Sequence, residues 1–273
     1  MKTITFIGTG NMATAIISGM LSAGHNAGII TVYDKFAEKA ATFAEKGVNV
    51  ASSIKDAVAA SELIILAVKP QNYAEVLSEI AQSGVNTDSK TFISIAAGIS
   101  TAAVSKMLGR DAAVVRCMPN TPLMVGKGVT AICKNAAASD EDFALVHSIF
   151  GSAGMTLSLD ESQLNTVICA NGSSPAYFYY FIDAMVRSAK SQGLECDDRT
   201  LLEAICRTVI GSAEMLMASD KTPAELIRAV TSPNGTTERA MNVFYEEMTD
   251  EIIDRAMRAC TDRAEEMAKA YGA

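Results

Sequence analysis

The sequence has no long apolar run, no cluster of basic residues and no pair of closely spaced cysteines. Its longest apolar segment, residues 63–68, stops at Lys69 and Pro70, whereas a membrane span needs roughly 18 apolar residues. The residues after Met1 and Lys2 lack the apolar core and cleavage region of a signal peptide. We therefore expect a cytoplasmic protein without a membrane segment.

Basic residues are outnumbered. The chain has 23 Lys and Arg against 31 Asp and Glu, a formal net charge of −8. Proteins that bind DNA or RNA usually carry a basic patch or stripe, and none occurs here. We expect no nucleic-acid partner, and instead small molecules or other protein surfaces.

Metal-binding residue types are also scarce. His25 and His147 are the two histidines, and the cysteines form no CxxC pair. A zinc site is not expected from this pattern, and the cysteines are interpreted as free thiols packed like small apolar residues. The six cysteines are Cys117, Cys133, Cys169, Cys196, Cys206 and Cys260.

The length of 273 residues corresponds to one large or two modest domains at about 150 residues each. Short β-branched runs alternate with helical stretches up to about Glu161, and several runs are apolar on both faces, as in a parallel sheet covered by helices. This pattern predicts a doubly wound α/β domain over residues 1–161. The expected strands are residues 3–7, 29–33, 63–68, 91–95, 113–118, 129–133 and 155–159. The expected helices are residues 11–23, 37–46, 73–82, 101–108 and one that begins near Ser139, with Asp142 three residues on.

Residues 162–273 read as helices only, over 175–192, 199–218 and 250–270. The last helix has a narrow apolar stripe, but the first two are apolar on nearly every face and must be covered all round. About 110 residues offer too few partners within one subunit, so we expect a homo-oligomer that shares this all-α domain. The alternative is that the N-terminal domain covers these faces.

A glycine-rich turn follows the first expected strand and opens the first helix. Gly8 permits a tight turn, and Gly10 lets backbone N–H groups approach a pyrophosphate at the helix start. Ala13 takes the place of the third glycine of this dinucleotide fingerprint. The alternative is a tight turn without a ligand. The expected cofactor residues here are Gly8, Thr9, Gly10, Asn11 and Met12.

Two residues at the end of the second strand bear on the choice of dinucleotide. Asp34 lies at the usual distance for an acid that binds the ribose 2′-OH of NADH. Lys35 follows and is able to pair with the 2′-phosphate of NADPH. The two residues argue in opposite directions, and a solvated charge pair at a strand end is a third interpretation.

Five further segments together resemble pyrroline-5-carboxylate reductases, in the expected order and over nearly the whole chain. The last two are the most specific, because the glycine fingerprint is shared by many dehydrogenases. The segments are Ala67, Val68, Lys69 and Pro70; Ala96, Ala97 and Gly98; residues 116–122 (RCMPNTP); residues 172–177 (GSSPAY); and residues 231–237 (TSPNGTT).

This resemblance implies a Rossmann domain that binds NADPH or NADH, with NADPH favoured. It also implies an all-α C-terminal dimerisation domain, an intertwined dimer that often assembles into a decamer, and the last step of proline synthesis. Ala67, Val68, Lys69, Pro70, Ala97 and Gly98 would line the dinucleotide. Asn120 would lie near the nicotinamide, and Ser232 through Thr237 would hold the substrate carboxylate.

Taken singly, these segments have structural interpretations. Lys69 and Pro70 can end a strand, residues 119–122 can form a rigid turn, and residues 173–177 can start a helix. The chain also departs from the family pattern. Asn234 stands where glycine is usual, so the loop needs either a positive φ, which Asn tolerates, or a modified turn. Ile227, Arg228 and Asn171 replace the common Lys, Asp and Ser.

Reduction of a cyclic imine needs a hydride donor, a proton on nitrogen and a grip on the carboxylate. The backbone N–H groups of Gly235, Thr236 and Thr237 at a helix start suit a carboxylate. Thr237 is the candidate for the residue that binds substrate through its hydroxyl, with Ser232 beside it, and the alternative for Thr237 is an ordinary helix cap. An imine can enter already protonated, so no strong general acid is required.

Two other functions compete with imine reduction. A dehydrogenase of the β-hydroxyacid type would need an acid for its alkoxide, which that group takes from a lysine on the first helix of the second domain. Residues 173–185 contain no lysine. A dinucleotide-binding regulatory protein without turnover is the other alternative, supported only by Asn234 and Arg228.

Overall fold

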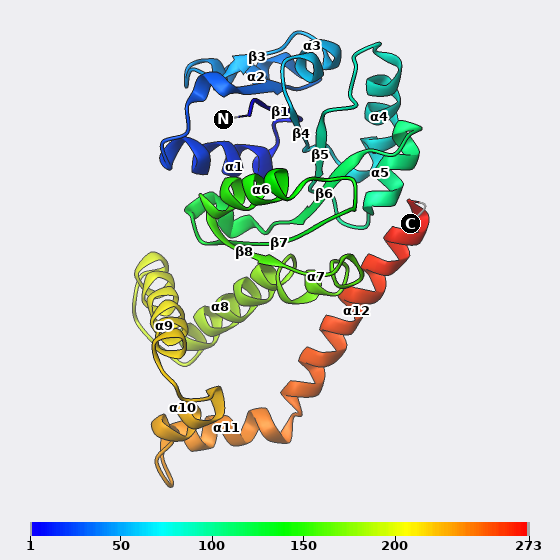
Figure 1. Ribbon diagram of the computed structural model, residues 1–273. Helices are drawn as coiled ribbons and strands as arrows, with labels where there is room; N and C mark the ends of the chain where they lie inside the picture. Colours follow the sequence, from blue (N-terminus) through cyan, green and yellow to red (C-terminus); the bar gives the residue numbers. More distant parts are fainter. Residues whose placement is uncertain (1, 272–273) are drawn as a thin grey trace. The chain divides into compact units, whose positions relative to one another are not determined.

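The computed structural model describes residues 2–271 (Figure 1). The chain divides by its internal contacts into two compact units. The first holds residues up to Pro175 and the C-terminal segment from Ala259, and the second is Ala176–Arg258. The domain boundary predicted between residues 161 and 162 is not tested by this division and stays a prediction.

The first unit is built on an eight-stranded sheet with the order β3-β2-β1-β4-β5-β6-β7-β8. The first six strands in this order, β3-β2-β1-β4-β5-β6, are parallel. β7 is antiparallel to β6, and β8 is parallel to β7. The seven predicted strands are confirmed to within two residues at each end, and the two-residue β3 was not predicted. The strands are β1 (Ile4–Ile7), β2 (Ile30–Tyr33), β3 (Asn49–Val50), β4 (Leu63–Leu66), β5 (Thr91–Ser94), β6 (Ala113–Met118), β7 (Gly128–Lys134) and β8 (Gly154–Ser158).

Helices cover both faces of this sheet, because alternate strand residues enter two separate apolar cores. Leu63 and Ile65 of β4 join the core beneath α1, α2 and α6, while Ile64 and Leu66 join the core beneath α3, α4 and α5. This two-sided packing is the predicted doubly wound arrangement. The helices are α1 (Asn11–Ser22), α2 (Ala37–Ala44), α3 (Ile54–Ala59), α4 (Tyr73–Gln82), α5 (Thr101–Leu108), α6 (Asp140–Gly151) and the short α7 (Val167–Ala170).

The start of α6 follows the predicted capping pattern. The backbone N–H of Asp142 donates to the Ser139 hydroxyl at 3.1 Å. The Asp142 carboxylate also accepts hydrogen bonds from Lys2 at 2.6 Å and from Thr91 at 2.7 Å. One side chain therefore joins α6 to Lys2, two residues before β1, and to the start of β5.

Helices make up the second unit. The three predicted helices are confirmed to within one residue at each end, and α11 begins where the sequence predicted a helix start, at residues 235–237. The short α10 was not predicted. A capping box between Thr222 and Glu225, with Pro223 in the first turn, starts α10. The last five helices, of which α12 continues from the second unit into the first at Ala259, are α8 (Ser174–Ser191), α9 (Asp198–Ala218), α10 (Pro223–Val230), α11 (Thr236–Glu246) and α12 (Thr249–Ala270).

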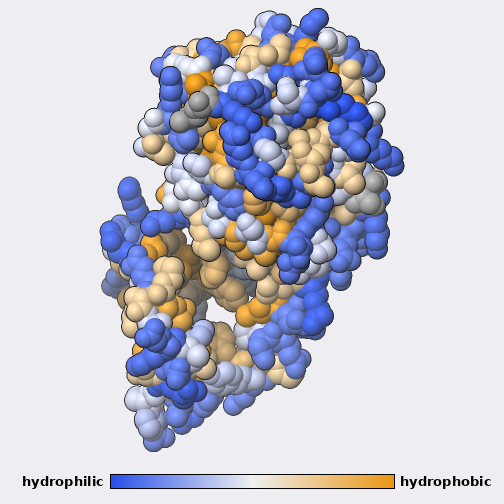
Figure 2. All heavy atoms as spheres, in the orientation of Figure 1, coloured by the Kyte–Doolittle hydropathy of each residue, from blue (hydrophilic) through white to orange (hydrophobic). Residues whose placement is uncertain are grey.

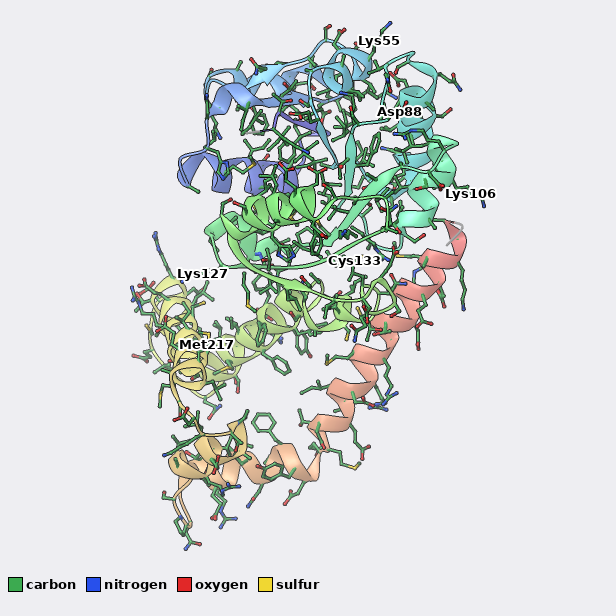
Figure 3. The ribbon with its side chains drawn as sticks, viewed as in Figure 1. Lys55, Asp88, Lys106, Lys127, Cys133 and Met217 are labelled. Atoms are coloured by element: carbon green, nitrogen blue, oxygen red, sulfur yellow. The ribbon has the colours of Figure 1, made fainter. Side chains whose placement is uncertain are left out.

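Large apolar side chains of the second unit face solvent in the single chain. Tyr180 is 67% exposed, and Met217, labelled in Figure 3, is 79% exposed. Orange, apolar residues appear at the surface over α8 and α9 in Figure 2. Large exposed apolar side chains that gather on one part of a globular protein mark an interaction surface. None of the helices in residues 2–271 combines the length and apolar character needed to cross a membrane.

Candidate dinucleotide and substrate sites

The predicted cofactor residues meet at one edge of the sheet. The strand order places β1 between β2 and β4, so the chain leaves β1 on one side and later returns on the other (Figure 1). In open α/β sheets, ligands bind at such a switch point, outside the carboxyl ends of the strands. The predicted residues follow the carboxyl ends of β1, β2, β4, β5 and β6.

Gly8 forms the tight turn after β1, as predicted. Its φ is +98°, and its N–H donates to the Tyr33 carbonyl at 2.7 Å. A Cβ at this position would lie 2.7 Å from the carbonyl oxygen of Ala67, closer than side chains tolerate. The turn therefore requires glycine for its backbone angle and for its approach to the segment after β4.

Gly10 is different, because it has an ordinary φ of −69° as the N-cap of α1. No heavy atom lies within 4 Å of the position that its Cβ would take. The first N–H groups of α1, including those of Asn11 and Met12, have no partner within the helix. Open space at Gly10 and free N–H groups at a helix start together suit a pyrophosphate, while Ala13 packs into the core at 1% exposure.

Asp34 holds the glycine turn with its carboxylate. One oxygen accepts hydrogen bonds from the Thr9 backbone N–H at 2.8 Å and its hydroxyl at 2.9 Å, and the other accepts from the Phe36 N–H at 3.0 Å. Partial burial raises the pKa of Asp34, but these hydrogen bonds outweigh it, so the pKa lies below its ordinary value. Asp34 is therefore ionised at neutral pH. The neighbouring Lys35 has a mostly exposed ammonium 3.8 Å from Glu75.

The segment after β4 is tied to β1 at its first residue. The Ala67 N–H donates to the Ile7 carbonyl at 2.8 Å. Lys69 has an extended backbone, and Pro70 begins a 3-10 helix over Pro70–Asn72. β4 ends at Leu66, two residues before the predicted end at residue 68, so Lys69 and Pro70 follow the strand and do not themselves end it. The segment lies beside the glycine turn, and its cofactor role stays a prediction.

Gly98 lies in the segment after β5 and contacts the end of α12. Its φ is +75°, and a Cβ would lie 3.0 Å from the Met267 Cβ and 3.1 Å from the Ala268 backbone nitrogen. The same segment is fixed at Thr101, whose N–H and hydroxyl each donate to the Glu161 carboxylate at 2.7 Å. The structure thus gives Gly98 a packing role against α12, and its role in lining the dinucleotide stays a prediction.

Asn120 is buried and both ends of its amide are used within the chain. Its Oδ1 accepts from the Val129 N–H at 2.8 Å, and its Nδ2 donates to the Asn171 carbonyl at 3.3 Å. The Asn171 side chain donates in turn to the Met118 carbonyl at 2.8 Å. Asn120 therefore joins the end of β6 to the residues before α8, and its proximity to a nicotinamide stays a prediction.

The predicted substrate loop lies in the second unit. Asn234 has a φ of +60°, which confirms the first of the two conformations expected for this departure from glycine. Its N–H donates to Glu238 at 2.8 Å, and the Gly235 N–H donates to the Ser232 carbonyl at 2.9 Å. Gly235 is the N-cap of α11, and no side chain caps this helix.

Thr237 is consequently the second residue of α11 and not its N-cap. The sequence left open whether this hydroxyl caps the helix, and the structure removes that interpretation. The N–H groups of Thr236 and Thr237 lie in the first turn, where helices have unpaired donors and partial positive charge. This turn is suited to a carboxylate ligand.

Sequence reasoning did not single out Tyr73 and Ser94, whose hydroxyls are hydrogen-bonded to each other at the ends of the strands that precede two of the predicted cofactor segments. Tyr73 was read only as the first apolar residue of a helix, and no local pattern marks a buried hydroxyl that bonds to a distant strand. Within residues 2–271, no group of three or more His, Cys, Asp and Glu side chains is placed to hold a metal ion.

Comparison with known proteins identifies the family. The family model described as pyrroline-5-carboxylate reductase dimerisation matches residues 161–267. The one described as NADP oxidoreductase, coenzyme F420-dependent, matches residues 3–98. The pyrroline-5-carboxylate reductase of Haemophilus influenzae is 38% identical over 273 residues, covering 97% of each chain.

Solved structures agree over the same length. A pyrroline-5-carboxylate reductase from Coxiella burnetii superposes with a TM-score of 0.89 at 32% identity, covering 98% of each chain. The pyrroline carboxylate reductase of Plasmodium falciparum with NADP bound gives a TM-score of 0.88 at 26% identity, also covering 98% of each chain. With the glycine turn and the loop before α11 both in place, this chain belongs to the pyrroline-5-carboxylate reductase family.

Proposed function

We propose that this protein reduces 1-pyrroline-5-carboxylate to L-proline with NADH or NADPH. The observation that carries the proposal is the full-length similarity to pyrroline-5-carboxylate reductases, at 38% identity over 97% of the chain. The site residues described above are consistent with this reaction. A reduced nicotinamide supplies the hydride when it is bound. The chain therefore has to bind and orient the two reactants and to exclude water from between them.

On the cofactor side, the open space at Gly10 and the first N–H groups of α1 hold the pyrophosphate. Asp34 fixes the turn and, through its remaining lone pairs, is able to accept a ribose hydroxyl. The exposed Lys35 is available for a 2′-phosphate. Both reduced dinucleotides are therefore proposed as cofactors, and NADPH is favoured because the Plasmodium falciparum relative has NADP bound.

On the substrate side, the first turn of α11 holds the carboxylate. The N–H groups of Thr236 and Thr237 supply donors, and the helix dipole favours the negative charge. The Gly235 N–H, which the sequence also offered as a donor, is instead hydrogen-bonded to the Ser232 carbonyl at 2.9 Å. The Thr237 hydroxyl has no capping role in the structure and is assigned to the substrate, with Ser232 contributing to the loop that orients it.

The proton on the ring nitrogen does not need a dedicated acid. An imine of this kind can be protonated before it enters, and the hydride then neutralises the iminium. A carbonyl substrate would instead form an alkoxide that needs a proton donor. The first turns of α8 carry no lysine for that purpose, which supports a C=N substrate over a hydroxyacid.

The exposed apolar faces of the second unit are proposed to form the dimer interface, in agreement with the dimerisation family that matches residues 161–267. Further assembly into a decamer is proposed from the family resemblance. We also place the protein in the cytoplasm, because its six cysteines are all unpaired, as expected for a reducing compartment.

Steady-state kinetics test the proposal directly. The purified chain should oxidise NADPH or NADH only when 1-pyrroline-5-carboxylate is present, with L-proline formed in equal amount. Turnover of a β-hydroxyacid with no turnover of the imine would favour the dehydrogenase alternative. Dinucleotide binding without any turnover would favour a regulatory protein.

A further inference from the structure

The hydroxyl of Tyr73 lies beneath the two segments that border the proposed cofactor site. Tyr73 is the first residue of α4, and its side chain is completely buried. Its hydroxyl donates to the Leu66 carbonyl at 2.7 Å. Leu66 is the last residue of β4, so this hydrogen bond closes a loop that contains residues 67–72.

The same hydroxyl also reaches the neighbouring strand. It accepts a hydrogen bond from the Ser94 hydroxyl at 3.2 Å. Leu66 and Ser94 are register partners in the parallel ladder between β4 and β5, and each is the last residue of its strand. One oxygen therefore links the two strand ends from which the segments at Ala67 and Ala97 begin.

Two further contacts carry this link to the glycine turn. Ala67 is hydrogen-bonded to the end of β1 through the Ile7 carbonyl at 2.8 Å. The Ala67 carbonyl oxygen is also the atom that limits the space at Gly8. A shift of the segment after β4 would therefore displace the turn that presents the helix start to the pyrophosphate.

The Tyr73 hydroxyl keeps its proton under working conditions. Burial raises the pKa of Tyr73 above its ordinary value, against smaller opposing effects of hydrogen bonds from Ser94 and from the backbone of Ile95 and Ala96. A neutral hydroxyl donates one hydrogen bond and accepts others, which matches its donation to Leu66 and its acceptance from Ser94.

We propose that Tyr73 is a positioning residue for the dinucleotide, whose hydroxyl keeps the segments after β4 and β5 in the conformation that binds the cofactor. The residue does not touch the cofactor in this proposal, and it acts through Leu66 and Ser94. The inference rests on the proposed function, because it assumes that these segments border a dinucleotide.

The test is Tyr73→Phe, which removes one oxygen and retains the ring. Calorimetric titration of the purified apo-protein should show a Kd for NADPH about three- to tenfold higher than that of the wild type, as expected for one lost hydrogen bond. The KM for the dinucleotide should rise by a similar factor. The kcat and the KM for 1-pyrroline-5-carboxylate should stay within about twofold, because the lost hydrogen bond lies beneath the cofactor segments only.

Tyr271→Phe is the matched control. Tyr271 packs against the same apolar core as Tyr73, and among the described residues its hydroxyl has no hydrogen bond. Tyr271→Phe removes the same atom but breaks no hydrogen bond, so the Kd for NADPH should not change. Ser94→Ala removes only the link to β5 and should raise the Kd less than Tyr73→Phe. The double variant should match Tyr73→Phe alone, since Ser94 acts through that hydroxyl.

A folded Tyr73→Phe protein with a lower melting temperature but an unchanged Kd well below that temperature would overturn the proposal, because the hydroxyl would then be purely structural. If Tyr73→Phe does not fold, an unchanged Kd in Ser94→Ala overturns it instead. Failure of the wild type to bind any dinucleotide, or to reduce the imine, would contradict the proposed function and is distinguished from these results by the wild-type measurement itself.

Discussion

Gly10→Val separates folding from dinucleotide binding at one backbone position. Gly10 has a φ that any residue adopts, and its missing Cβ faces open space. A Cβ at this position meets no heavy atom within 4 Å, and valine adds two methyl groups beyond it. With a dinucleotide bound, they would occupy the place where the pyrophosphate approaches the start of α1.

The expected cost to folding is small. Valine is a poorer N-cap than glycine by about 1 kcal/mol. Valine also restricts the unfolded chain more than glycine does, which stabilises the folded state by about 0.4 to 1 kcal/mol. The net change in the free energy of unfolding is therefore within about 1 kcal/mol, against a typical total of about 5 to 15 kcal/mol. The variant should fold.

The expected cost to binding is larger. If the pyrophosphate loses one charged hydrogen bond, the binding free energy weakens by about 1.5 to 3 kcal/mol. This corresponds to a Kd one to two powers of ten higher. Gly10→Ala adds a single carbon and should lie between the wild type and Gly10→Val. Gly8→Ala, in contrast, should destabilise the fold, because its φ of +98° and its contact with Ala67 exclude a side chain.

Calorimetric titration with NADPH and NADH, together with urea unfolding of the same preparation, measures both quantities. Gly151→Val is the control, since Gly151 also has open space at its Cβ and lies in α6, which contains none of the predicted cofactor residues. An unchanged Kd in a folded Gly10→Val protein would refute the cofactor assignment.

Four other predictions follow from the structure. Thr237→Ala should lower kcat/KM for 1-pyrroline-5-carboxylate by about one to two powers of ten while dinucleotide affinity is retained; an unaltered kcat/KM would contradict the role of its hydroxyl. Lys35→Ala should weaken the binding of NADPH more than that of NADH in parallel titrations if the ammonium binds the 2′-phosphate. Equal changes in the two Kd values would exclude that contact. Asp142→Asn should lower the free energy of unfolding by about 1.5 to 3 kcal/mol, because the ion pair with Lys2 is lost. Burial raises the pKa of Asp142, but hydrogen bonds from Lys2, Thr91 and Ser139 lower it by more than burial raises it. The native pKa therefore lies below the unfolded value. Its contribution is complete above about pH 4 and is lost as the pH falls through the native pKa, and urea titrations at several pH values should show this loss for the wild type only. Sedimentation at micromolar concentration should show a dimer or larger, and a stable 28.8 kDa monomer would rule out the shared helical interface.

Periodicity made most of the first unit predictable from the sequence. Strands apolar on both faces, such as residues 63–66, must lie inside a covered sheet, and glycines close the helices between them. The two residues of β3 are too few to form a periodic signal, and both are exposed. The start of α11 was predicted at residues 235–237, but its length was not, and the eight-residue α10 was missed because so short a helix gives little periodic signal.

Local sequence also predicted the turns better than the contacts that fix them. The positive φ of Asn234 follows from the residue type, since asparagine tolerates the left-handed region. The contact of Gly98 with Met267 joins residues far apart in the chain, and nothing near Gly98 announces it. The hydrogen bonds of Asn120 to Val129 and Asn171 were hidden for the same reason.

The carboxylate of Glu161 has a consequence for the order in which the chain folds. It binds the first residue of α5 from 60 positions further along the sequence, and it lies 3.6 Å from the buried guanidinium of Arg116. During synthesis from the N-terminus, all eight strands, β1 to β8, emerge before this residue does. Until then the Arg116 charge lacks the carboxylate partner that offsets its burial, which disfavours a closed sheet. Completion of the sheet therefore depends on a residue beyond its last strand, and this timing keeps the β6 region open until the start of the helical segment has emerged.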